Sequence, residues 1–358
     1  MADVCSRVDY LLLHPSEVTA SPNSVLRMLR RMSSIDSLDL ERGFGNVVTS
    51  DILKVIASYP ALDQAVLPYV RDDYLLALQT DADMQLFPKL RYLYTGATAE
   101  SLRLYHRVAP KIEALGLTNE TLKRTNDVLT AASKFRQLTS FTAQLSTSSI
   151  IRGEELIHLA QGCQNLEELK IGIDSWSEIK PSAVGITDEL IEQLAPYLRN
   201  LRNFYLLFVS DTQDAPGCIR SIQSLGRHCK HLEELVLSCR PDWEWIATLS
   251  QVEAVPLAAG LEQLQLLPNG HMRQCLTEEE HSTLLTIWRS TARIWLPHID
   301  LMMIRDADDW EDAFVDALVP ADIGTDEQAD DEDSKIAVDG AEELGITTTM
   351  DQVTLQDL

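Results

Sequence analysis

Leucine and other large apolar residues recur along this chain in a short pattern, L-x-x-L-x-L, in which most positions written x are polar or small. Because successive side chains of a β-strand point to opposite faces, the pattern predicts a short strand with one buried face. Eleven copies, whose starts lie 22 to 35 residues apart, predict a repeat protein. The strands are expected to start at Val8, Ile35, Leu62, Leu90, Ile112, Leu138, Leu166, Leu201, Leu232, Leu261 and, with a poorer match, Leu296.

Amphipathic stretches separate these strands and predict helices. Start signals precede several of them: Ser50–Asp51, Asn119–Glu120, and Thr277 followed by Glu278–Glu280. Two longer connections, 174–186 and 210–217, contain proline and glycine and are expected to be irregular loops. One strand, one turn and one helix in each period predict a right-handed α/β solenoid of about eleven repeats over residues 1–305. The expected helices are Ser24–Met32, Asp51–Tyr59, Ala99–Val108, Glu120–Lys134, Gly153–Gln161, Thr187–Leu198, Cys218–His228 and Glu278–Thr291.

Three central segments carry a more specific pattern: LAQGCQNLEELKI at Leu159–Ile171, LGRHCKHLEELVL at Leu225–Leu237, and ITDELIEQLAPYLRNL at Ile186–Leu201. They resemble the cysteine-containing leucine-rich repeat of F-box/leucine-rich-repeat proteins. The resemblance implies that the chain recognises protein partners, and that it selects substrates for a cullin–RING ubiquitin ligase. It departs from the family at Asp174, Val209 and Arg240, where cysteine or asparagine is usual. The first strand starts at Val8, so no F-box module, which binds the ligase adaptor, is expected before it.

The net charge of −25 is concentrated at one end of the sequence. Residues 306–358 contain 18 acidic residues and one basic residue, Lys335, which leaves −8 for the first 305 residues. This tail is expected to be largely disordered. Residues 308–318, with Trp310, Phe314 and Leu318 on one side, are expected to form a helix that caps the last repeat, and a linear acidic–hydrophobic interaction motif is the alternative. A field of this sign disfavours nucleic acid and favours a basic partner for the tail.

The sequence predicts no catalytic, cofactor-binding or metal site, and so a protein that is not an enzyme. Cys218, His228, Cys229, His231 and Cys239 lie close together in the sequence, but their spacing matches no zinc pattern. Cys163 and Cys229 occupy the same repeat position and are expected to be buried thiols. All six cysteines are expected to be reduced, since the start lacks a secretory signal and no apolar run is long enough for a membrane span. We therefore expect a cytoplasmic or nuclear protein.

The expected binding surface is the concave face of the sheet, where the x positions of the strand pattern point away from the core. Tyrosines there are the kind of residue that anchors a protein partner. Two other functions remain open: a regulator resembling GTPase-activating proteins, which also pair repeats with an acidic tail, and a chaperone for basic proteins. The candidate partner-binding residues are Tyr92, Tyr94, Glu168, Lys170, Asn203, Tyr205, Glu234, Gln263 and Gln265.

Overall fold

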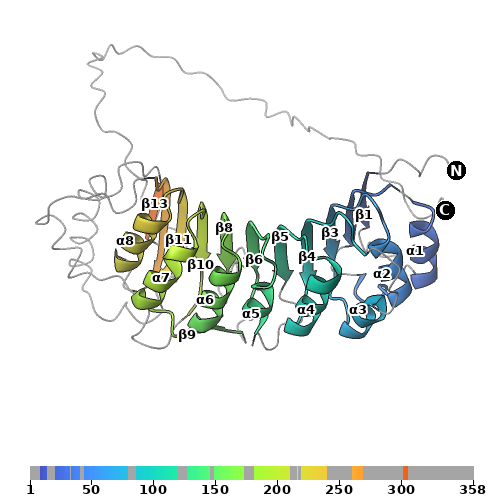
Figure 1. Cartoon of the computed structure of the whole chain (residues 1–358), viewed down its shortest axis with the longest axis horizontal. Helices are drawn as coiled ribbons and strands as arrows, with labels where there is room; N and C mark the ends of the chain where they lie inside the picture. Colours follow the sequence, from blue (N-terminus) through green and yellow to red (C-terminus); the bar gives the residue numbers. More distant parts are fainter. Residues whose placement is uncertain are drawn as a thin grey trace, which may run out of the picture. The chain divides into compact units, whose positions relative to one another are not determined.

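The computed structural model describes residues 9–13, 21–32, 34–40, 44–79, 86–118, 127–145, 149–172, 181–209, 216, 219–239, 260–268 and 301–304. In these residues eleven strands form one parallel sheet, with almost every strand hydrogen-bonded to the strand of the next repeat (Figure 1). The sheet contains, in order, β1 (Tyr10–Leu13), β2 (Ser37–Leu40), β3 (Gln64–Leu67), β4 (Tyr92–Gly96), β5 (Ala114–Thr118), β6 (Ser140–Ala143), β8 (Glu168–Ile171), β10 (Asn203–Leu206), β11 (Glu234–Cys239), β12 (Gln263–Pro268) and β13 (Leu301–Ile304).

From β1 to β11, helices connect successive strands of the sheet and lie along one side of it (Figure 1). Parallel strands joined through helices are the architecture expected of a leucine-rich-repeat-like α/β solenoid, which confirms the predicted fold. None of these helices combines the length and the hydropathy needed to cross a bilayer. The helices are α1 (Pro22–Leu29), α2 (Ser50–Ala57), α3 (Asp72–Gln79), α4 (Ala99–Val108), α5 (Val128–Ala132), α6 (Gly153–Gly162), α7 (Asp188–Leu194), which continues as a 3₁₀ turn at Ala195–Tyr197, and α8 (Ile219–His228).

Apolar side chains form a continuous row through the core. Leu93 of β4 pairs with Leu115 of β5, and the same register continues through Phe141, Leu169, Phe204 and Leu235 to Leu264 of β12. Each of these side chains is at most 2% exposed. Because the strand period is two, this register turns the x positions of every strand to the opposite face.

Hydroxyl side chains begin the helices. Thr98 and Ser101 form a reciprocal capping box at the start of α4, in which each hydroxyl accepts a hydrogen bond from the other residue's backbone N–H (3.0 and 2.7 Å). Thr187 caps α7 through the N–H of Leu190 (3.3 Å). The start of α2 differs from the prediction, because Thr49 rather than Ser50 is the capping residue.

Cys163 and Cys229 are buried free thiols, as predicted. The thiol of Cys163 donates to the carbonyl of Phe135 (3.4 Å), and that of Cys229 donates to the carbonyl of Ala195 (3.8 Å). Each thiol thus joins the end of one helix to the preceding repeat, and burial raises both pKa values to about 12. Cys239 is disulfide-bonded, so the prediction that all six cysteines are thiols is wrong for this residue. Spacing alone does not report which thiols a fold brings together.

Several elements differ from the prediction. The pattern did not predict α3, nor the parallel pair β7 (Ile150–Arg152) and β9 (Ser182–Val184), which lies partly in a predicted loop. The strand expected from Leu296 begins instead at Leu301, and its Met302 and Ile304 pair with the core residues of β12. Of the predicted helix Glu120–Lys134, only Val128–Ala132 is helical in the described part. The predicted helices 278–291 and 308–318 and the acidic tail lie outside the described residues.

Candidate functional site

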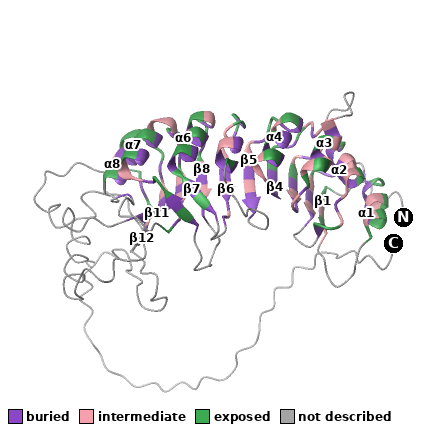
Figure 2. Ribbon diagram, turned by 90° about the horizontal axis from the view of Figure 1, so that it is seen from below, coloured by how far each residue is buried: buried purple, intermediate pink, exposed green. Residues whose placement is uncertain are grey.

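The open face of the sheet is the face that carries the first and third side chains of the strands, on the side away from the helices (Figure 1). Figure 2 shows the alternation along the strands, with purple core positions next to pink or green positions. Tyr92 is 38% exposed, whereas the next residue, Leu93, is 2% exposed. All nine predicted partner-binding residues lie on this face. Val236 of β11 occupies an equivalent position but is only 8% exposed.

We call Tyr92 and Tyr94 of β4, with Gly116 of β5, the aromatic patch. A Cβ atom at Gly116 would lie 1.9 Å from Cδ2 of Tyr94, so the Tyr94 ring occupies the space that a side chain on β5 would fill. The Arg91 guanidinium lies 5.3 Å from the centre of the Tyr92 ring, within the range of a cation–π interaction. The patch therefore offers aromatic surface beside β5, which has only Ala114 and Gly116 at its open-face positions.

Ser140, Glu168, Lys170, Tyr205 and Glu234 form what we call the charged network, which crosses β6, β8, β10 and β11. The Ser140 hydroxyl donates to Oε2 of Glu168 (2.5 Å), and Lys170 forms an ion pair with the same carboxylate. The Lys170 ammonium also lies 4.9 Å from the centre of the Tyr205 ring. The Tyr205 hydroxyl donates to Oε2 of Glu234 (2.5 Å). Each member thus fixes the position of the next.

These contacts shift the pKa values of the network. Burial would raise the pKa of Glu168, but the hydrogen bonds from Lys170 and Ser140 outweigh it and lower the pKa below its usual value. Burial first, and then the hydrogen bond to Glu234, raise the pKa of Tyr205. The phenol is therefore protonated at neutral pH and acts as the donor to Glu234.

A row of ten side chains, nearly all charged, borders the open face immediately before the strands. At the nine positions from Asp9 to Glu233, the backbone carbonyl accepts two successive N–H groups of the next repeat. For example, the carbonyl of Asp63 accepts from Arg91 (2.9 Å) and Tyr92 (3.0 Å). Seven of the ten positions are acidic, and we call those seven the acidic row: Asp9, Asp36, Asp63, Glu113, Glu167, Glu233 and Glu262.

Two arginines interrupt the acidic row, and both are paired within it. Arg91 forms a two-pronged ion pair with Asp63 (2.6 and 3.1 Å) and lies 3.6 Å from Glu113. Arg202 lies 2.6 Å from Glu233. The sequence analysis missed this row, although its signal was present, since every member is the first x of the L-x-x-L-x-L pattern.

The other predicted residues have fewer interactions. Asn203, Gln263 and Gln265 form no side-chain hydrogen bond within the described part of the chain, so their amides are available to a partner. The same part contains no group of three or more potential metal-ligating side chains. The described part of the face is thus a broad polar surface with aromatic groups.

No protein-family model and no curated protein matches this sequence. Among solved structures, the leucine-rich repeat-containing protein LegL7 from Legionella pneumophila aligns at 13% identity and a TM-score of 0.41, covering 83% of this chain and 90% of that one. The complex of Rad7 and Elc1 from yeast aligns at 13% identity and a TM-score of 0.38, covering 79% of this chain and 73% of that one. At this level neither likeness bears on function, and the fold assignment stands on the sheet topology described above.

Proposed function

We propose that this chain is a non-enzymatic recognition scaffold that binds a protein partner on the open face of its sheet. One observation carries the proposal. Across β4 to β12 the face presents exposed tyrosine, amides that have no hydrogen-bond partner in the described residues, and positioned charges, all held by one backbone register. Aromatic groups with polar surroundings are typical of the energetically dominant parts of protein interfaces.

We further propose that the partner is a substrate for a cullin–RING ubiquitin ligase, and that the chain acts in the cytoplasm or nucleus. The resemblance of three repeats to those of F-box proteins supports this context. Two of them contain Cys163 and Cys229, whose buried thiols join successive repeats.

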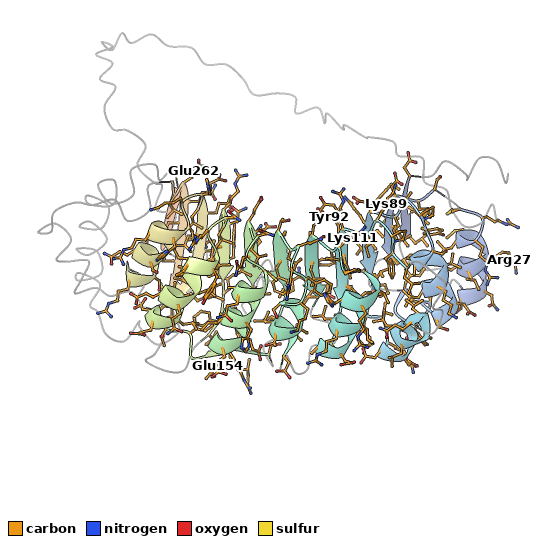
Figure 3. The ribbon with its side chains drawn as sticks, viewed as in Figure 1. Arg27, Lys89, Tyr92, Lys111, Glu154 and Glu262 are labelled. Atoms are coloured by element: carbon orange, nitrogen blue, oxygen red, sulfur yellow. The ribbon has the colours of Figure 1, made fainter. Side chains whose placement is uncertain are left out.

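Affinity purification of the full chain from a eukaryotic lysate, with quantitative mass spectrometry, tests both proposals. We expect Tyr92→Ala combined with Tyr94→Ala to remove the partner. Glu154→Gln serves as the control because Glu154 is exposed on the helix side (Figure 3). A partner that both variants retain equally would contradict binding at the open face.

Recovery of a cullin-ligase adaptor with the wild-type chain is expected if the ligase proposal is right. A partner that depends on Tyr92 but comes without any adaptor would leave a recognition scaffold and remove the ligase context. Each of the two proposals can therefore be contradicted without the other.

A further inference from the structure

The open face differs in charge between its middle and its later repeats. Around the aromatic patch, Lys89, Arg91 and Lys111 outnumber Asp63 and Glu113; the two lysines are exposed (Figure 3). Over β8 to β12 the balance reverses. Five carboxylates, which we call the acidic region, stand against Lys170 and Arg202: Glu167, Glu168, Glu233, Glu234 and Glu262.

The cations of the acidic region are already paired inside the protein. Lys170 pairs with Glu168, and Arg202 pairs with Glu233. Two nearby cations contact the ends of the helices instead: Arg199 donates to the carbonyl of Pro196 (3.1 Å), and Lys230 donates to that of Gly226 (2.8 Å). A basic partner would therefore meet carboxylates there, whereas an acidic partner would have to break existing ion pairs.

The geometry sets the size of the partner segment. From β4 to β11 there are five strand-to-strand steps, which span ~24 Å at the usual spacing of parallel strands. A helix of ~16 residues has this length. Its turns repeat every ~5.4 Å, close to the strand spacing of ~4.8 Å, so side chains one turn apart would face successive strands.

Building on the proposed function, we propose that the open face binds a helical partner segment laid across the strands, with lysine or arginine over the acidic region and an apolar side chain on Tyr92. Charge complementarity selects this occupant. The acidic tail of the chain itself is an unsuitable occupant, because residues 306–358 carry a net charge of −17 and would be repelled by the acidic region.

Selection of random ~16-residue peptides on the full chain, by display at about physiological salt, tests the proposal. We expect enriched peptides with basic residues at one end and an apolar residue about four turns away. Their affinity is then measured against three variants. The first, which we call the acidic-region variant, combines Glu167→Gln, Glu234→Gln and Glu262→Gln; the amide oxygen introduced by Glu234→Gln can still accept the Tyr205 hydrogen bond.

The helix-side variant is the matched control. It combines Glu154→Gln, Glu189→Gln and Glu192→Gln, three exposed residues of α6 and α7, and changes the net charge equally. It therefore corrects for the general attraction of basic peptides to an acidic protein with an acidic tail. The third variant is Tyr92→Ala. Circular dichroism and thermal unfolding confirm that each variant is folded.

Support for the proposal is affinity about ten-fold weaker for the acidic-region variant and for Tyr92→Ala, with the helix-side variant within about two-fold of wild type. Equal losses in the acidic-region and helix-side variants would show general charge attraction and overturn it. Peptides that depend on Tyr92 but not on the acidic region would also overturn it, while leaving the proposed function intact. If no peptide is enriched, or if the affinity of the enriched peptides is the same for wild type and all three variants, both proposals are contradicted.

Discussion

The aromatic patch and the charged network occupy equivalent positions in repeats with the same backbone register, yet they differ in how their side chains are held. Lys170 and Tyr205 each contact partners on neighbouring strands, so the network is fixed before anything binds. Tyr92 has Arg91 beside its ring, and Tyr94 lies over a glycine. Cross-strand contacts of Lys170 and Tyr205 hold the network in place. The patch therefore offers surface to a partner, while the network offers a fixed pattern of charge.

Each region has a glycine beside it: Gly116 in the aromatic patch and Gly172 after strand β8 of the charged network. Substituting alanine at each is expected to have a different effect on stability. Gly172 follows the strand that carries Glu168 and Lys170. It has a φ of +83°, and a Cβ there would lie 2.0 Å from the carbonyl oxygen of Leu207. Because that oxygen belongs to the backbone, Gly172→Ala is expected to reduce the free energy of unfolding by about 3 kcal/mol. Urea denaturation measures this loss.

Gly185→Ala is the matched control for that prediction. Gly185 also has a positive φ, +70°, but a Cβ there would meet no atom within 4 Å. It should cost only the backbone strain, about 1 kcal/mol. Equal losses for the two variants would contradict a specific clash between a Cβ at Gly172 and the Leu207 carbonyl oxygen.

Glu155 and Glu168 belong to the same repeat, and they compare a carboxylate buried in the core with a carboxylate of the charged network. Glu155 of α6 is 5% exposed; its Oε1 accepts from the N–H of Asp127 (3.2 Å), but its Oε2 has no hydrogen-bond partner in the described residues. Burial raises its pKa. Removing the buried charge by Glu155→Gln is expected to stabilise the protein by about 1 kcal/mol near pH 7.

The raised pKa of Glu155 sets the direction in which stability changes with pH. A folded state with a raised carboxyl pKa binds the proton more tightly than the unfolded state, so wild-type stability falls as the pH rises from about 4.5 through the raised pKa. The advantage of Glu155→Gln should therefore shrink as the pH is lowered from about 8 to about 5. The lowered pKa of Glu168 contributes stability that is fully present above about pH 4.5 and is lost only as the pH falls through that lowered pKa, so Glu168→Gln should destabilise by a nearly constant amount from about pH 8 to about pH 5. Unfolding free energies of both variants across this range test the contrast; the same sign for both would contradict it.

Tyr205→Phe removes one link of the charged network and keeps the ring beside Lys170. The lost hydrogen bond leaves a partly buried Glu234 carboxylate without its donor, so a loss of about 1 kcal/mol is expected. Tyr92→Phe is the control, since no hydrogen bond of its hydroxyl is found in the described part of the chain, and it should change stability little. Thermal unfolding distinguishes them; equal shifts would mean that the network does not stabilise the fold.

Much of the fold followed from the sequence because one physical signal, a buried leucine at alternate strand positions, recurs in almost every repeat. The signal weakened where other residues replaced leucine. Met302 and Ile304 stand in register with Leu264 and Leu266 of β12, where the pattern expects leucine, and the pattern therefore placed that strand too early, at Leu296. The helix α3 was not predicted, although Asp72 and Asp73 are residues that suit a first helical turn.

The candidate site was predictable only as a set of positions. The strand pattern placed Tyr92, Glu168 and Tyr205 on one face, which the structure shows. It did not show that Lys170 would lie over Tyr205 or that Tyr205 would donate to Glu234, since those contacts depend on the register between strands that are separated in the sequence. Nor did β7 and β9 carry a usable signal, since each is only three residues long.

Gly116→Ala should have the smallest effect on stability and a clear effect on recognition. The new Cβ would meet a side chain, the Tyr94 ring, and side chains shift more readily than the backbone oxygen beside Gly172. The free energy of unfolding should therefore change by less than about 1 kcal/mol. The displaced ring would alter the surface beside Tyr92, and peptides selected on the wild-type chain should bind more weakly. Unchanged binding with a rearranged Tyr94 would show that the Tyr94 ring takes no part in recognition.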